Sequence, residues 1–398
     1  MVAAFFLAKK FEPEVKDAIV YELNQYLNVP VDVEDINLSL LQKFPYASLR
    51  FSHVVIPEAV SDDPDTLIFI EDLYLQIGLL DFLSKEYKVS EAEINRGFFD
   101  MQIFKDGSDN FHFWRNSNDS TAQSFSLTNV EVEDFEYRLE TGAGLALDIH
   151  VNSGEANGNF GEDIFSLRSD VDLVARSIIY ENDTLYKKTE LDGEVALNIN
   201  TKSKVYTFES ERILLGEEKI ALNGSYNDFS ESAFWKVQIT SENTELENAV
   251  ALTPLPNQSI FKTYQPTGNA DLDLIIDTKN GFDLTVNFDG LEGKIIHSES
   301  SGRANIFSGR GTFSLAQGQT NLSINGVEAG IGPGRFTTSG EIRNFNSPSF
   351  DLALQGRLEL EDLKDFLNIS FVEILEGRID IRGKLEGKIA QTNLSTER

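Results

Sequence analysis

The 398-residue sequence contains no cysteine. This absence excludes disulfides, thiolate catalysis and metal sites with cysteine ligands. Histidine is scarce as well, and the four present, His53, His112, His150 and His297, do not stand at the spacing of a metal-binding pair on a helix. We therefore expect each histidine to have an ordinary role in a strand or a loop, and we predict no metal and no cofactor.

Basic residues are few. The chain has 34 lysines and arginines against 65 acidic residues, which gives a formal net charge of −31, and the basic residues are scattered. Nucleic-acid binding requires a clustered basic surface that displaces counterions from phosphates, so we predict no nucleic-acid partner. The same charge would repel an anionic membrane surface.

The apolar run at the N-terminus is short. Residues 1–8 precede Lys9 and Lys10, whereas a helix that crosses a bilayer needs about 20 apolar residues. The run also lacks the basic region and the cleavage site of a secretory signal. It is either a frayed end or the last turns of a membrane anchor whose beginning is missing. We favour the anchor, with residues 1–10 as its remnant, because a helical pattern follows directly.

This helical pattern covers residues 11–28. Glu12 and Pro13 suit a first helical turn, and Asn28 and Pro30 suit its end. The apolar residues at helical spacing are Val15, Ala18, Ile19, Leu23, Tyr26 and Leu27. The sequence therefore predicts an amphipathic helix at this point.

Beyond residue 30 the hydrophobic period changes to two, which is the period of β-strands. Residues 47–56 alternate in this way, and the next such stretch is interrupted at Glu71. Its apolar residues share one parity and predict a strand with one buried face: Leu67, Phe69, Leu73, Leu75 and Ile77. A short helix at residues 79–85 and a strand at residues 88–95 follow. The polar stretch 116–124 predicts a linker.

After the linker the same alternation recurs many times. It covers the sets Leu145, Leu147, Ile149 and Val151; Val195, Leu197 and Ile199; Leu272, Leu274 and Ile276; and Phe282, Leu284, Val286 and Phe288. Five dipeptides are typical of hairpin turns: Asp192-Gly193, Asn223-Gly224, Asn280-Gly281, Asp289-Gly290 and Asn325-Gly326. Polar residues between the apolar ones place one face in water. The pattern predicts an extended antiparallel sheet rather than a parallel sheet buried on both faces.

A weak internal repeat supports this architecture. Residues 245–250 and 361–367 both read as short, acidic helices that follow a strand and precede, after a loop, a strand led by Gly268 or Gly377. Repeats of one supersecondary unit predict a stacked, elongated fold. The last strands, within residues 377–390, read as a pair that begins a further repeat, so we expect β-repeats to continue beyond Arg398.

Catalytic patterns are weak. Residues 330–335 superficially resemble a phosphate loop, but they lead into another strand and favour a hairpin. Asp62, Asp63 and Asp65 lack the spacing of a calcium loop and favour a solvated turn. With 65 carboxylates, some pair will always resemble a glycosidase dyad. We predict that the protein is not an enzyme. The 29 phenylalanines either form sheet core or line an apolar groove.

The most informative motif is Asp-Gly-Ser-Asp-Asn-Phe-His-Phe-Trp at residues 106–114. Asp106 and Gly107 predict a turn, after which the aromatic residues must pack back against a sheet. Together with Lys-Phe-Pro at residues 43–45, the alternating strand after it and the helix before it, the motif resembles the AsmA family of envelope proteins from diderm bacteria. The resemblance is strongest over residues 11–115.

The resemblance implies a mainly β fold: an elongated, curved antiparallel sheet that forms a groove, with an N-terminal helix and short connecting helices. Residues 11–115 would form the helix-plus-sheet unit, and residues 125–398 the groove repeats. It further implies an anchor in the inner membrane, a periplasmic location and a role in outer-membrane biogenesis. Phospholipid would be the passive cargo, and outer-membrane proteins would be further partners.

The candidate residues for the lining of a groove or for the core are Leu49, Phe51, Leu73, Leu75, Ile77, Phe111, Phe113, Trp114, Leu272, Leu274, Ile276, Phe282, Leu284, Val286 and Phe288. Two other classes of protein compete with the lipid hypothesis. A secreted, carbohydrate-active β-solenoid enzyme would need acids and aromatic residues that converge on one face. An outer-membrane β-barrel would need strands of about 9 to 11 residues with aromatic girdles, and the charges on both parities argue against it.

Overall fold

The computed structural model describes residues 29–39, 46–60, 65–78, 89–111, 127–142, 144–158, 164–180, 183–227, 233–252, 264–298, 302–345, 347–366 and 374–388. Several sequence predictions lie outside these residues: the helix at 11–28, the helix at 79–85, the linker at 116–124, the turn with Asp62 and Asp63, and the aromatic residues Phe113 and Trp114. No helix of the described ranges has the length and apolar character required to cross a bilayer.

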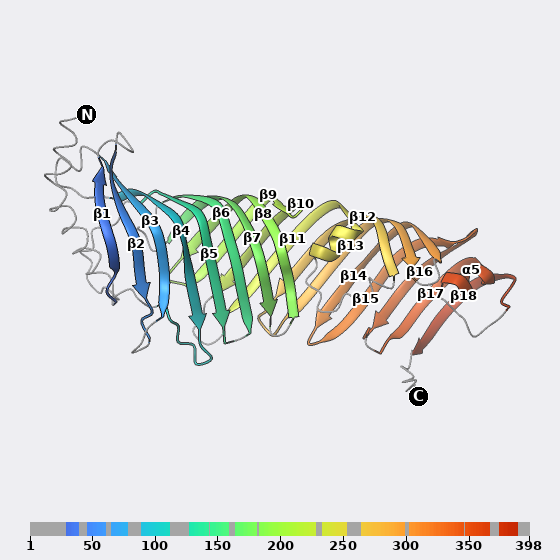
Figure 1. Cartoon of the computed structure of the whole chain (residues 1–398). Helices are drawn as coiled ribbons and strands as arrows, with labels where there is room; N and C mark the ends of the chain where they lie inside the picture. The colour runs from blue at the N-terminus through green and yellow to red at the C-terminus, as the bar shows by residue number, and fades with distance from the viewer. Residues whose placement is uncertain are drawn as a thin grey trace, which may run out of the picture. The chain divides into compact units, whose positions relative to one another are not determined.

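The protein is mainly β, as Figure 1 shows. Its chain divides into two compact units. The first unit holds β1 (Asp32–Ser39), β2 (Tyr46–Pro57), β3 (Thr66–Gly78), β4 (Val89–Ile103), β5 (Asn129–Thr141), β6 (Leu145–Gly158), β7 (Ile164–Tyr180), β8 (Asp183–Asn200) and β9 (Val205–Leu215). The second unit holds β10 (Glu218–Asn227), β11 (Phe234–Glu245), α3 (Leu246–Leu252), β12 (Tyr264–Asp277), β13 (Asp283–His297), β14 (Arg303–Ala316), β15 (Gln319–Ile331), β16 (Gly334–Arg343), β17 (Ser349–Glu359), α5 (Leu360–Phe366) and β18 (Arg378–Lys388).

Within each unit the strands pair in chain order and antiparallel, with one exception. β4 and β5 run parallel. A parallel pair requires a long connection between its strands, and residues 104–128 separate β4 from β5 in the sequence. The meander expected from the sequence is therefore confirmed apart from this pair, while residues 378–388 form one strand rather than the expected strand pair.

A row of polar residues crosses the first unit where the strands bend. His53, Glu71, Arg96, Asp134 and Asn152 lie between registered pairs of β2 to β6. His53, Arg96 and Asp134 have φ of 52°, 57° and 53°, which non-glycine residues seldom adopt. The side chains that share a face are separated by three residues here, as Phe51 and Val54 are, instead of by two. Each strand therefore places two consecutive polar residues on one face and bends, as at a bulge.

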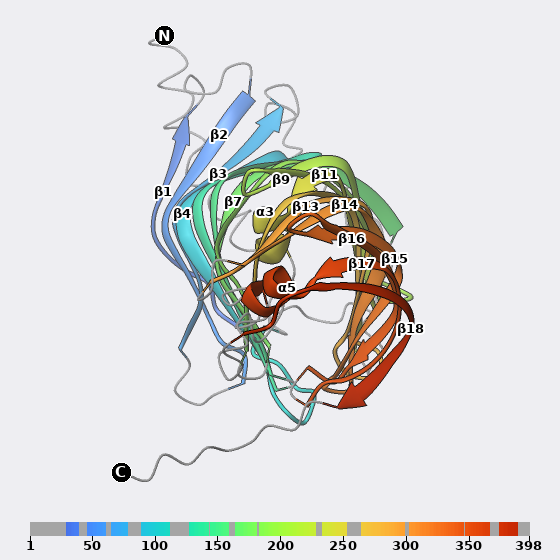
Figure 2. The same cartoon turned by 90° about the vertical axis from the view of Figure 1, so that its right-hand side faces the viewer.

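Bulges also interrupt the second unit. Register shifts occur in β11, β12, β14 and β15, between Ser241 and Thr244, Asn269 and Asp271, Ile306 and Ser308, and Ile324 and Val327. Bulges kink a strand and increase its twist. Figure 2 shows the strands of this unit curving around α3 and α5.

Most of the expected hairpin turns are wrong, and three of the dipeptides lie at bulges instead. Only Asn280-Gly281 joins two strands, β12 and β13. The other four dipeptides lie inside β8, β10, β13 and β15, and Gly193, Gly290 and Gly326 have φ of 144°, 62° and 155° there. Positive φ serves a bulge as well as a turn, so an Asp-Gly or Asn-Gly dipeptide does not by itself distinguish the two.

The repeated strand-helix-strand arrangement is confirmed. α3 follows β11 and precedes β12, and α5 follows β17 and precedes β18. The first turn holds one acidic residue in α3, Glu247, and two in α5, Glu361 and Asp362, where they suit the positive end of the helix dipole. The strands on either side of each helix pair with each other, β11 with β12 and β17 with β18.

The turn at Asp106 and Gly107 is also confirmed. The Asp106 carboxylate accepts hydrogen bonds from the Ser108 hydroxyl at 2.6 Å and the Ser108 backbone amide at 3.1 Å, which hold the pKa of Asp106 below the usual range. Gly107 has φ of 82°. Phe111 then packs against the fully buried Leu67. The segment after β4 thus folds back onto β3, as expected.

Candidate functional site

One face of the first unit is apolar across all nine strands. Residues that face one another on neighbouring strands form a continuous row: Val33, Val54, Ile70, Gly97, Phe135, Val151, Leu173, Leu191 and Leu215. The row runs perpendicular to the strands. Cross-strand pairs of this kind are the units from which a sheet face is built.

The structure brings together the residues that the sequence selected in β2 and β3. Leu49 lies opposite Leu75, and Phe51 lies opposite Leu73. Leu49 and Ile77 are 0% exposed and Phe51 is 1% exposed, so these three side chains form core, whereas Leu73 and Leu75 are half-buried. Phe111 belongs to the separate cluster around Leu67.

The sequence predicted that the apolar residues 67, 69, 73, 75 and 77 of β3 lie on one face of the strand. This prediction is wrong for Phe69, which precedes the bend. Ile70 packs in the same cluster as Leu73 and Leu75, whereas Phe69 does not. The ring of Phe69 lies 6.0 Å from that of Phe98, on the other face. The cause is the bend at Glu71, where two consecutive residues lie on one face and the alternation shifts by one.

The second unit has a comparable apolar row. It contains one residue from each of eight strands, β10 to β17: Leu222, Ile239, Leu274, Val286, Phe313, Leu322, Ile342 and Phe350. Gly387 of β18 lies opposite the last member. The row mixes buried residues such as Leu274, at 3% exposure, with half-buried ones such as Leu322.

The structure also pairs the residues that the sequence selected in β12 and β13. The pairs are Leu272 with Phe288, Leu274 with Val286, and Ile276 with Leu284. Leu274, Leu284 and Val286 are buried, and the other three are half-buried. Phe282 is half-buried just before β13 begins. The alternate residues of the two strands thus belong to the same apolar face of the sheet.

In the second unit the apolar row faces the inside of the curve. The bulge between Ile324 and Val327 adds one residue to β15 and shifts the alternation by one. Leu322 and Ile331 therefore share one face of the strand, although one number is even and the other odd. Ile331 packs in a cluster with Leu363 and Phe366 of α5. Figure 2 shows α5 inside the curve of the strands. The concave face is therefore the apolar one.

Sequence analysis missed the part of this row that lies in β14 to β17. Phe313, Leu322, Ile342 and Phe350 stand in strands rich in glycine and serine, and Phe307 sits at a bulge in β14 that breaks the period of two. The available signal was the alternation on each side of the bulge. It becomes visible only when the two sides are read separately.

The opposite face of the second unit is polar. The row next to the apolar one consists of Asp273, Asn287, Thr312, Ser323, Glu341, Asp351 and Glu386. Thr312 Oγ1 donates to Asn287 Oδ1 at 2.9 Å, and Lys384 Nζ lies 3.0 Å from Asp351 Oδ1. Adjacent residues of one strand thus separate an uncharged face from a charged one.

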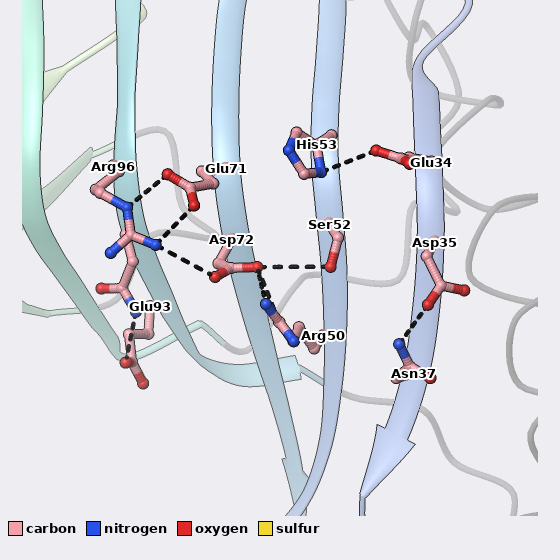
Figure 3. A network of polar contacts seen from close by, with 11 residues as sticks. Glu34, Asp35, Asn37, Arg50, Ser52, His53, Glu71, Asp72, Glu93 and Arg96 are labelled. Carbon is pink, nitrogen blue, oxygen red and sulfur yellow. Dashed lines mark hydrogen bonds and ion pairs between the residues drawn. The ribbon is translucent and has the colours of Figure 1, made fainter.

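The polar face of the first unit carries an ion-pair network, shown in Figure 3. Arg50 Nε and Nη2 both lie 2.8 Å from Asp72 Oδ1, and Ser52 Oγ lies 3.5 Å from the same oxygen. Arg96 Nη2 donates to Glu71 Oε1 at 2.8 Å and holds the pKa of Glu71 below its ordinary value. These arginines neutralise carboxylates at the bend of the strands.

The histidines of the described ranges, His53, His150 and His297, all lie in strands. His53 Nδ1 lies 3.0 Å from Glu34 Oε2, and His150 Nε2 lies 3.5 Å from Asp134 Oδ1. His297 is buried at the end of β13. Within the part of the chain that the structure describes, no group of three or more His, Cys, Asp or Glu residues is arranged to hold a metal ion.

The apolar face of the first unit also contains a phenol. Tyr137 lies opposite Phe99 and Ile149, and burial raises the pKa of its hydroxyl further above physiological pH. Its hydroxyl lies 3.0 Å from Met101 Sδ. The side chain therefore adds area to the apolar face without adding charge.

Comparison with known proteins does not identify the chain. No family model, no curated protein and no solved structure matches it. Each unit has an apolar face and a polar face, and basic side chains pair with carboxylates on the polar face. Such an arrangement suits the shielding of an apolar ligand from water on one side and solvation on the other.

Proposed function

We propose that the protein binds the acyl chains of phospholipid along its apolar face. The observation that carries the proposal is the row of apolar cross-strand neighbours, which is continuous through β1 to β9 in one unit and through β10 to β17 in the other. Each methylene group removed from water contributes roughly 0.8 kcal/mol. A long apolar row therefore gives an acyl chain many equivalent contacts.

The binding would be passive. The ligand would lie on side chains that carry no charge, while its head group would remain in water, and no covalent step is involved. Equivalent contacts along a row favour sliding, because no single position is strongly preferred. This property suits a carrier or a conduit better than a store.

We further propose the cellular role that the resemblance to the AsmA family implies. The protein would be anchored in the inner membrane, face the periplasm of a diderm bacterium and act in outer-membrane biogenesis, by passing phospholipid between the two membranes. The mainly β architecture and the turn at Asp106 agree with this resemblance. Outer-membrane proteins would be its further partners.

Photocrosslinking from phenylalanine positions tests the binding face. Phe313 and Phe350 belong to the apolar row, whereas Phe307 lies on the opposite face, where the Arg335 guanidinium stands 4.2 Å from the centre of its ring. Each is replaced in turn by p-benzoylphenylalanine, and the full chain is incubated with vesicles of radiolabelled phosphatidylethanolamine and phosphatidylglycerol. The same substitution at all three sites keeps the chemistry of the probe constant.

We expect radiolabel on the variants at Phe313 and Phe350 and only background on the variant at Phe307. Equal labelling at all three positions would mean that lipid associates without using the apolar face. Absence of labelling from every position, in protein that is folded by circular dichroism, would refute lipid binding altogether.

A further inference from the structure

Helix α5 covers part of the concave apolar face of the second unit. Leu363 and Phe366 pack against a buried cluster of one residue from each of three strands: Ala304 in β14, Ile331 in β15 and Leu358 in β17. Phe336 of β16 and Ile381 of β18 flank this cluster. The helix thus crosses several strands of the face that we propose for acyl chains.

The contact is close at the backbone. A Cβ atom on Gly302 would lie 2.4 Å from Phe366 Cα, and a Cβ atom on Gly332 would lie 2.2 Å from Asp362 Oδ2. A side chain at position 302 would push the backbone of the helix away from the sheet, whereas one at position 332 would meet the side chain of Asp362. The absence of side chains at the two glycines therefore allows α5 to lie directly on the ends of β14 and β15.

The helix itself is weakly held. It has seven residues, and none of its side chains is buried. Isolated helices of this length are unstable in water, so the docking of α5 depends on the partly buried Leu363 and Phe366. Two apolar side chains on an uncharged surface resemble the contacts that a short length of acyl chain would make.

We propose that Ala304, Ile331 and Leu358 form the floor of an acyl-chain subsite, and that α5 is a displaceable cover which occupies this subsite until lipid replaces it. The inference rests on the proposed lipid binding and adds a regulated position to it. On this view, Leu363 and Phe366 compete with the ligand for the same surface. Lipid at the subsite and docked α5 exclude each other.

The test compares two crosslinking positions on the same face. Phe336 lies beside the covered cluster, and Phe350 lies in the open part of the apolar row. p-Benzoylphenylalanine is placed at one or the other in the full chain, with the vesicles described above at a sub-saturating concentration. Each probe is combined with Leu363→Asp and Phe366→Asp together, with Phe366→Ala alone, or with the exposed control Asp365→Asn.

We expect lipid labelling at position 336 to rise when α5 is weakened. A cover that is docked about nine-tenths of the time lowers the apparent affinity of the subsite by roughly tenfold, and its removal restores that factor. Labelling at position 350 should not change, and Asp365→Asn should leave both positions as they are. Unchanged labelling at position 336 beside normal labelling at position 350 would overturn the cover while leaving lipid binding intact. Loss of labelling at both positions would instead count against the proposed function.

A second measurement uses the otherwise unmodified chain and does not depend on weakening α5. Because the sequence has no cysteine, single cysteines at Asp365 on α5 and at the exposed Ala353 on β17 accept spin labels at those two sites only. Pulsed electron paramagnetic resonance then measures the distance between them. We expect the distance to lengthen and its distribution to broaden on addition of the same vesicles. An identical distribution with and without lipid would refute displacement.

Discussion

Asn110 Nδ2 donates a 2.7 Å hydrogen bond to Glu58 Oε1, and this contact ties the turn after β4 to the end of β2. Asn110 is 0% exposed. Its amide also donates to the Asp100 carbonyl at 3.1 Å, and its Oδ1 accepts from the Gln102 amide at 2.8 Å. Every hydrogen-bonding group of the side chain is used. The asparagine of the 106–114 motif is thus a structural junction.

Replacement of Asn110 by Ala should destabilise the first unit strongly. The variant leaves the Gln102 amide and the Asp100 carbonyl without their side-chain partner, and an unsatisfied buried polar group costs about 1 to 3 kcal/mol. Denaturation with guanidinium chloride measures the free energy of unfolding. The control is Asn37→Ala, because Asn37 is exposed and its side chain donates to the nearby Asp35 Oδ2. Equal stability of the two variants would contradict the junction.

Two glycines of the second unit should respond oppositely to alanine. Gly340 has φ of 136°, and a Cβ atom there would lie 2.1 Å from the Asp351 carbonyl oxygen. Gly383 has no heavy atom within 4 Å of such a Cβ. We expect Gly340→Ala to lower the melting temperature substantially, since backbone strain of this kind costs on the order of 1 to 3 kcal/mol. Gly383→Ala should be neutral or slightly stabilising. A fully stable Gly340→Ala variant would show that β16 can relax away from β17.

Adjacent residues of β15 offer a test of the two faces. Leu322 belongs to the apolar row, and Ser323 belongs to the polar row. Leu322→Asn would place a polar side chain between Phe313 and Ile342, so we expect this variant to reduce the amount of phospholipid that copurifies with the protein. Ser323→Asn should leave the amount of copurified phospholipid unchanged. Lipid extraction followed by mass spectrometry measures the amount, and melting curves show whether both variants are folded. Equal lipid content would remove the apolar row from the proposal.

The carboxylate of Glu136 should make the first unit sensitive to acid. Arg176 Nη1 donates to Glu136 Oε1 at 2.9 Å, and this hydrogen bond lowers the pKa of Glu136. A pKa that is lower in the folded state contributes stability above the pKa of the unfolded state, and the contribution is lost as pH falls through the folded value. Arg176→Gln should raise the pKa of Glu136, which nuclear magnetic resonance titration can follow, and should reduce stability at neutral pH relative to low pH. Arg168→Gln, an equal charge change on the same strand, should leave that titration unchanged.

The sequence predicted the strands well because each has enough length to show its period. Leu272, Leu274 and Ile276 are partners of Phe288, Val286 and Leu284 in the structure, as two alternating segments around Asn280-Gly281 indicated. The side chains that face the same way were therefore identifiable in this hairpin without coordinates.

The bends were not predictable in the same way. Phe69 and Leu73 have the same parity, yet the polar pair Glu71 and Asp72 places them on opposite faces. A polar pair within a strand looks like an ordinary interruption, and only the alignment of such pairs across neighbouring strands shows that it is a bend. The parallel pairing of β4 with β5 was hidden for a related reason, since partner choice depends on the connection and not on the composition of either strand.

The bend in the first unit is encoded strand by strand. Ser52 with His53, Asn95 with Arg96, and Glu133 with Asp134 each supply the bend of a single strand, and the pairs meet only because the register aligns them. A duplicated hairpin would therefore bring its own curvature with it. The loss of one residue from such a pair would, in contrast, move every later side chain of that strand to the opposite face of the sheet. A sheet of this design should therefore tolerate the gain or loss of a whole hairpin better than the loss of a single residue from a bend.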